Sequence, residues 1–343
     1  MTTIIPDRPM TYIYKVINIL PIDGADKIEL VQVEGWNCVV KKNEFKIGDL
    51  GIYFTIDSVL DKNIPEFAFL EGKPLKTRKI RNVISQGLFM PISILISFPL
   101  LINPKEKDDV TEHYNVKKYI KSEENDIYIQ KDKNNSDIFD SFPDFIPKTD
   151  EDRIQNNLSL LQKLKERNVV FIRKEDGTSC TFTIKDNKFS IQTRNLTIKI
   201  ETQNTTKYYD IERKHNIEKT MRDNGFNNIA IRGELVGPKI NGNKLQLSMN
   251  EYHVFNVFDI DKQKYIKWDD VIIFAKKMNL LLAPEIFRYE KFNIDNIQDL
   301  LKIADEIEYK KHIPAEGFVL STNDDNIRIS AKVISNKYLI KNN

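Results

Sequence analysis

The first sixty positions carry short runs of β-branched and aromatic residues at intervals of about ten residues, each bounded by a turn signal. The runs cover residues 12–17, 28–33, 39–40 and 52–54. The turn signals between them are Asp23-Gly24, Glu34-Gly35 and Gly48-Asp49. Short strands at this spacing are typical of small antiparallel barrels. We therefore predict a five-stranded barrel of the OB type in this region.

A basic cluster follows the predicted barrel. The chain has 52 Lys and Arg against 50 Asp and Glu, so its formal net charge is only +2 and a polyanion must be bound by a local patch. Such a patch is available at Lys76, Arg78, Lys79 and Arg81. These side chains could bind phosphates, and they could equally be the charges that protect an exposed strand edge from aggregation.

The uncharged stretch of residues 82–104 is long enough to cross a bilayer, but Pro91 and Pro99 would break a helix there. We expect buried strands and turns instead, and no membrane partner. The N-terminus has no apolar signal segment, and the chain has only two cysteines. We therefore expect a soluble intracellular protein, with no obligate protein partner evident.

A change in composition marks the expected domain boundary. Residues 105–140 are rich in charged residues, Asn and Ser, which is typical of a linker or a mobile loop. A length of 343 residues suggests about two domains. We predict an OB-like domain at 1–104, a linker or mobile segment at 105–140, and a second domain at 141–343.

The second domain is predicted to be α+β with mainly antiparallel sheets and helices. Thr149 is followed by three acidic residues, an N-cap pattern that predicts a helix at the start of this domain, with Ile154, Leu158, Leu161 and Leu164 on one face. Further strands are predicted at 169–173, 181–185, 189–193, 229–236, 253–259, 318–321 and 327–332, and helices near 210–224, 268–278 and 295–308.

One short pattern in this domain suggests chemistry. Lys174-Glu175-Asp176-Gly177 follows an apolar strand. A four-residue pattern with three fixed positions is weak by itself, since a strand that ends in a polar turn explains it equally well. Its weight comes from the segments that follow it in order: Thr193-Arg194-Asn195, Arg232-Gly233-Glu234, Val257-Phe258-Asp259, Glu316-Gly317-Phe318 and Ser330-Ala331-Lys332.

Together these segments resemble the motifs of the covalent nucleotidyltransferase superfamily, which contains ATP-dependent ligases and mRNA capping enzymes. The resemblance implies that Lys174 is the nucleophile that receives AMP from ATP, and that Lys332 and Arg194 bind the nucleotide. A lysine amine attacks phosphorus only when it is neutral. Lys332 and a divalent metal would therefore help by depressing the pKa of Lys174 and by stabilising charge on the phosphate. An exposed strand lysine is the alternative for Lys332.

The resemblance also implies a site for Mg²⁺ or Mn²⁺, held mostly through water by Asp176, Glu234 and Glu316. Hard oxygen ligands suit these ions. Taken singly, each glutamate could be a surface residue, and Asp176 could serve only to shape the turn. Glu234 would also contact the ribose, and Phe258 would stack on adenine. The alternative for Phe258 is that the ring belongs to the core.

Within this superfamily the chain resembles RNA ligases of the Naegleria and Deinococcus type, which place an OB domain before the nucleotidyltransferase domain. Phe145-Ile146-Pro147-Lys148-Thr149-Asp150 is similar to their sequence at the same point. The sequence ends soon after Lys332, so we expect no C-terminal OB domain of the kind that DNA ligases carry. One departure is Ser330, where RNA ligases often have a second lysine.

The implied reaction is ATP-dependent joining of 3′-hydroxyl and 5′-phosphate RNA ends, through lysyl-AMP and AMP-RNA intermediates. The RNA ends are expected in a nicked duplex whose 3′-hydroxyl strand is RNA. Candidate RNA contacts in the first domain are Trp36, Lys76, Arg78, Lys79 and Arg81, although the aromatic side chains of a barrel can also fill its core. Two alternatives stay open: an ATP-dependent DNA ligase, and a non-catalytic RNA-binding protein on a ligase fold.

Overall fold

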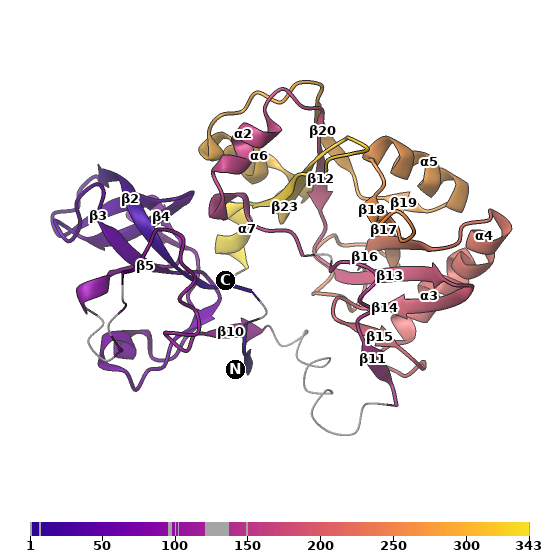
Figure 1. Ribbon diagram of the computed structural model, residues 1–343, viewed down its shortest axis with the longest axis horizontal. Helices are drawn as coiled ribbons and strands as arrows, with labels where there is room; N and C mark the ends of the chain where they lie inside the picture. Colours follow the sequence, from indigo (N-terminus) through magenta and orange to yellow (C-terminus); the bar gives the residue numbers. More distant parts are fainter. Residues whose placement is uncertain are drawn as a thin grey trace. The chain divides into compact units, whose positions relative to one another are not determined.

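The computed structural model describes residues 2–6, 8–94, 98–99, 101, 103–120, 137–148 and 150–342. The chain forms two compact units (Figure 1). Unit 1 comprises Met1–Tyr128, Gln155–Leu158 and Leu339–Asn343, and unit 2 comprises Ile129–Ile154 and Ser159–Tyr338. In the described residues, no helix is long and apolar enough to cross a membrane.

Unit 1 is built on a five-stranded antiparallel sheet in the order β4-β3-β2-β5-β9. Four of the strands contain the β-rich runs of the first sixty positions, and the fifth, β9, lies in the uncharged stretch further along the chain. They are β2 (Thr11–Pro21), β3 (Ile28–Val33), β4 (Trp36–Lys41), β5 (Leu50–Phe54) and β9 (Leu88–Pro91). The sheet curves until β4 meets the residues just before β9, where the Gln86 amide donates to the Asn37 carbonyl over 2.8 Å. This curvature confirms the predicted OB-like architecture.

The aromatic residues of these strands fill the core of unit 1. Trp36 is 1% exposed and stacks on Tyr53 with ring centroids 5.5 Å apart. Its Nε1 donates to Asn156 Oδ1 over 3.1 Å. The prediction of Trp36 as an RNA contact is therefore wrong for this structure, because a base cannot stack on a ring that is already enclosed.

The linker predicted at 105–140 also needs correction. Val110, Tyr114 and Val116 are buried in a core cluster of unit 1. They lead into β10 (Lys117–Ile120), which pairs with β1 (Thr2–Ile4) and β6 (Ser58–Val59). The charged residues between these apolar positions gave the segment the composition of a linker. Residues 121–136 lie outside the described residues, and 137–140 lead into a strand of unit 2.

Shorter elements complete unit 1. They are the β7–β8 hairpin (Arg78–Ile80 and Val83–Ser85) and the 3₁₀ helices η1 (Pro65–Leu70), η2 (Ile92–Ile94) and η3 (Ile154–Asn156), the last of which begins at the final residue of a unit 2 segment. The uncharged stretch expected to form strands and turns thus contains β8, β9 and η2. Residues 95–97, 100 and 102 of that stretch lie outside the described residues.

Unit 2 contains a large sheet in the order β11-β15-β14-β13-β16-β17-β18, with β19 paired in parallel to β17 (Figure 1). All other pairings in it are antiparallel, as predicted. The strands are β11 (Phe139–Ser141), β13 (Thr178–Lys185), β14 (Lys188–Gln192), β15 (Leu196–Ile198), β16 (Ile229–Val236), β17 (Glu251–Asp259), β18 (Lys264–Tyr265) and β19 (Leu281–Leu282).

A second antiparallel sheet has the order β20-β12-β23-β24. Its strands are β12 (Val169–Lys174), β20 (Glu285–Tyr289), β23 (Gly317–Thr322) and β24 (Ser330–Ile334), and a separate hairpin contains β21 (Glu308–Lys310) and β22 (Ile313–Pro314). Among the described residues, the helices are α2 (Ser159–Leu164), α3 (Thr206–His215), α4 (Ile217–Asp223), α5 (Trp268–Met278), α6 (Ile297–Glu306) and α7 (Asn336–Lys341), of which α7 begins in unit 2 and ends in the Leu339–Asn343 segment of unit 1.

The helix predicted from the acidic N-cap pattern is not formed as expected. Thr149 lies outside the described residues, and the segment after it forms only η3 and α2. The reason is a competing backbone pairing: the Lys332 amide donates to the Asp152 carbonyl over 2.8 Å, and Arg153 forms a parallel bridge with Lys332. The chain near Asp152 is held by β24 and begins its helix later.

The burial of Trp36 yields a test. Trp36→Ala should lower the free energy of unfolding by about 3–5 kcal/mol, because it removes a large buried ring. Phe69→Ala is the matched control, since Phe69 is an aromatic residue of the same unit that is 64% exposed, and it should change stability by at most about 0.5 kcal/mol. Urea unfolding followed by circular dichroism measures both, and equal small effects would contradict the core role of Trp36.

Candidate active site

The pairing of β12 with β23 places the predicted nucleophile against a carboxylate. Lys174 is in register with Gly317, so Glu316 lies at the adjoining position. Phe171 and Phe318, both fully buried, stack between these strands with centroids 4.5 Å apart. At the strand ends, Lys174 Nζ donates to Glu316 Oε2 over 2.9 Å.

Three carboxylates act on the Lys174 amine. Burial lowers the pKa of Lys174, but the negative charges of Glu316, Glu234 and Asp176 more than offset this, and the pKa lies above its usual value. Removal from water raises the pKa of Glu234 to about 8, with Lys174 lowering it and the other carboxylates raising it. The expected lowering of the pKa of Lys174 by Lys332 and a divalent metal stays a prediction.

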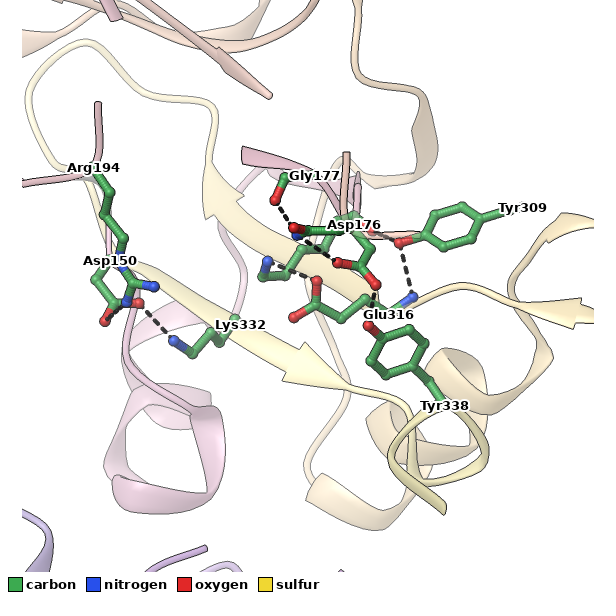
Figure 2. Close-up of polar contacts among 10 residues, drawn as sticks. Asp150, Asp176, Gly177, Arg194, Tyr309, Glu316, Lys332 and Tyr338 are labelled. Atoms are coloured by element: carbon green, nitrogen blue, oxygen red, sulfur yellow. Dashed lines mark hydrogen bonds and ion pairs between the residues drawn. The ribbon is translucent and has the colours of Figure 1, made fainter. Parts of the chain in front are cut away.

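Asp176 and Gly177 form the turn between β12 and β13. A Cβ atom at Gly177 would lie 2.3 Å from the Leu235 carbonyl oxygen, so only glycine allows the turn to approach β16. The Asn241 amide donates to Asp176 Oδ1 over 3.2 Å and to the Gly177 carbonyl. Asp176 Oδ2 accepts a hydrogen bond from Tyr338 OH (Figure 2).

Glu175, inside the nucleophile motif, is buried and paired. It accepts hydrogen bonds from Arg173 Nε and Nη2 over 3.1 and 2.7 Å, and His253 Nδ1 lies 3.5 Å from the same oxygen. Burial lowers the pKa of His253, but Glu175 and Glu251 outweigh it, and the pKa lies above its usual value. These contacts anchor Glu175, which lies between Lys174 and Asp176 in the motif.

Arg194 and Lys332, the two predicted nucleotide-binding cations, share one carboxylate. Asp150 Oδ1 accepts from Lys332 Nζ and Asp150 Oδ2 accepts from Arg194 Nη2, each over 2.7 Å (Figure 2). Lys332 is 8% exposed, so it is not the exposed strand lysine of the alternative interpretation. The Asp150 carboxylate thus lies between the two cations.

Neither Asp150 nor Tyr309 was given a role in the site by the sequence analysis. Asp150 was interpreted as part of a helix N-terminus, because three acidic residues after a threonine are typical of an N-cap and the first turn that follows it. Tyr309 had no signal at all. Its hydroxyl donates to the Lys174 carbonyl over 2.8 Å and accepts from the Glu316 amide over 3.2 Å. It therefore links the backbones of the nucleophile and its carboxylate partner.

Ser330, the departure from the RNA ligase pattern, also has partners. Its hydroxyl donates to Glu151 Oε2 over 2.6 Å, and Glu151 Oε1 accepts from Arg328. Glu151 thus links Ser330 to the acidic segment that also contains Asp150.

Phe258 does not present the ring face that adenine stacking requires. It is 3% exposed within a cluster that contains Ile146, Ala230 and Ile260. Tyr265 packs edge-on against it at 5.1 Å, and the buried Arg232 guanidinium lies 5.5 Å from its ring centre. The prediction of stacking is corrected to the alternative, a core residue, because its strand neighbours enclose the ring.

The oxygen donors near Lys174 fit a hard divalent cation. Carboxylates such as Asp176, Glu234 and Glu316 are the ligands that Mg²⁺ and Mn²⁺ prefer, and these ions usually keep several waters. Within the described ranges, no group of three His, Cys, Asp or Glu side chains is arranged to hold a metal by itself.

The curved five-stranded sheet of unit 1 is an OB-fold domain. Unit 2 places a lysine among three carboxylates and two cations around a fourth, which is the arrangement of a nucleotidyltransferase domain. The comparisons agree. An OB-fold domain profile matches residues 10–92, and the RNA ligase profile matches residues 167–334. No curated protein sequence gives a match.

Several solved structures are similar over nearly the whole chain. Naegleria gruberi RNA ligase with PPi is 31% identical with a TM-score of 0.85, covering 98% of this chain and 99% of that one. Two mutants of that ligase, one solved with ATP and Mn and one with AMP and Mn, are each 30% identical with TM-scores of 0.85, covering 97% of this chain and 98% of theirs. The chain belongs to the RNA ligase family.

The backbone at Gly317 gives a prediction for the site. Its φ is +134°, and a Cβ atom there would lie 2.0 Å from the Val333 carbonyl oxygen. Gly317→Ala should therefore push β23 from β24, displace Glu316 and lower the free energy of unfolding by about 2–4 kcal/mol. Gly225→Ala is the control, with φ +69° and open space around it, and should cost about 1 kcal/mol. Urea unfolding measures both variants. Equal losses of unfolding free energy in the two would contradict the close approach of Gly317 to β24.

Proposed function

We propose that this protein joins a 3′-hydroxyl end and a 5′-phosphate end of RNA, using ATP and a divalent cation. The contact of Lys174 Nζ with Glu316 beside Asp176 and Glu234 carries the proposal. The similar Naegleria ligase structures contain PPi, AMP with Mn, or ATP with Mn, and they support ATP and a divalent metal as the ligands of this site.

Lys174 is the nucleophile of the first step. Its amine loses a proton and attacks the α-phosphorus of ATP, so that a P–N bond forms and the bond to pyrophosphate breaks. The three carboxylates favour the ammonium form of Lys174. A divalent cation bound to those carboxylates and to the phosphates would remove this stabilisation and neutralise phosphate charge.

Arg194 and Lys332 bind the transferred nucleotide in this proposal. The guanidinium presents a planar fork and the ammonium a point charge, which together suit phosphate and ribose oxygens. Their common partner Asp150 holds both cations near one oxyanion position. Phosphate oxygens that displace the Asp150 carboxylate would meet two positive charges that already lie close together.

The later steps transfer AMP from Lys174 to the RNA 5′-phosphate, and the 3′-hydroxyl then displaces AMP to form the phosphodiester. Unit 1 is proposed to hold the 3′-hydroxyl strand. Arg78, Lys79 and Arg81 are exposed on or beside the β7–β8 hairpin and Lys76 is partly exposed, so they remain candidate phosphate contacts. A nicked duplex is the proposed form of the substrate.

The proposal is tested by sealing of a nicked duplex with a 5′-phosphate. The strand that ends in the 3′-hydroxyl is either RNA or DNA at its terminus. We expect sealing of the RNA-terminated nick to exceed that of the all-DNA nick by at least about tenfold, a difference of about 1.4 kcal/mol in activation free energy. Gel electrophoresis of labelled strands measures the rates.

Lys174→Ala should abolish sealing of both nicks, because no other group supplies the P–N bond. Lys188→Ala is the matched control, since Lys188 is an exposed lysine at the start of β14, and it should seal at the wild-type rate. Equal rates on both nicks would favour the DNA ligase alternative. Full RNA binding without sealing of either nick would favour the non-catalytic alternative.

A further inference from the structure

The helix α7 contributes a side chain to the site that no motif predicts. Tyr338 is 6% exposed, and its hydroxyl donates to Asp176 Oδ2 (Figure 2). The other carboxylate oxygen, Oδ1, accepts from the Asn241 amide over 3.2 Å. Asp176 is therefore held by one neutral donor on each oxygen.

The position of Tyr338 is fixed by the residues around the start of α7. Ser335 Oγ accepts from the Tyr338 amide over 3.1 Å and donates to Asp305 Oδ1 over 2.8 Å. The same Asp305 oxygen accepts from the Lys337 amide over 3.0 Å, which ties α7 to α6. These bonds fix the backbone at the start of α7, and from there the buried Tyr338 ring reaches Asp176.

The same segment also holds the backbone beside the second carboxylate. The Ser335 amide donates to the Glu316 carbonyl over 2.9 Å. Glu316 accepts the Lys174 ammonium, and Asp176 acts on the same ammonium electrostatically. Ser335 and Tyr338 thus connect α7 to both sides of the reactive lysine.

We propose that Tyr338 is a positioning residue that orients Asp176 toward the divalent cation of the adenylation step. This inference rests on the proposed function. A carboxylate offers about four lone-pair positions, and two donors leave about two of them for a metal-bound water. Because a fixed carboxylate loses less rotational freedom on metal binding, the hydroxyl should strengthen binding of the ion.

The test measures binding of Mn²⁺ directly, so that it does not depend on catalysis. Free Mn²⁺ is followed by its electron paramagnetic resonance signal in the presence of α,β-methylene-ATP, which cannot transfer AMP. Tyr338→Phe keeps the ring and removes the hydroxyl, and we expect it to weaken Mn²⁺ binding by about tenfold, the low end for residues that orient metal ligands. Tyr289→Phe, which removes a hydroxyl from β20, should leave binding unchanged.

A double-mutant cycle separates positioning from packing. If Tyr338 acts through Asp176, then Tyr338→Phe should cause no further loss in an Asp176→Asn background. Wild-type affinity in Tyr338→Phe, or the same fold loss in both backgrounds, would overturn the inference while leaving the proposed function in place. Failure of the wild-type protein to bind Mn²⁺ with the analogue would instead count against the proposed function itself, and the inference would fall with it.

Discussion

The antiparallel pairing of β12 with β23 is the constraint on which the site depends. It brings Lys174 and Glu316 together from distant parts of the sequence, and the stacked Phe171 and Phe318 rings hold the strands in register. Because two sheets meet at the Asp176-Gly177 turn, the carboxylate of Glu234 on β16 reaches the same lysine electrostatically. Burial then makes each of these charges act more strongly than it would in water.

Close backbone approach is the second requirement. Gly177 and Gly317 stand where a side chain would collide with a neighbouring strand. Tyr309 adds a hydroxyl that joins the Lys174 and Glu316 backbones, and Asp150 holds Arg194 near Lys332. Contacts within the protein thus orient these polar groups, which lowers the reorganisation needed during nucleotidyl transfer.

The sequence predicted the parts of this arrangement that depend on local pattern. The predicted strand at 229–236 and the predicted helix at 268–278 match the bounds of β16 and α5, and the ordered motifs located Lys174, Glu316 and Lys332. Burial was harder to predict: whether Trp36 or Phe258 faces solvent depends on what packs against it, which pattern alone does not reveal. Partners from distant segments, such as Tyr309 and Tyr338, left no signal because tertiary folding alone brings them to the site.

Mass-spectrometric mapping of the protein after incubation with ATP and Mg²⁺ or Mn²⁺ tests the central claim most directly. The proposed role of Lys174 as nucleophile predicts a single adenylyl group on this residue in the wild-type protein and none in Lys174→Arg, which keeps a positive charge but cannot supply a neutral amine. An adenylyl group on a different lysine, or no adduct with either metal, would contradict the account.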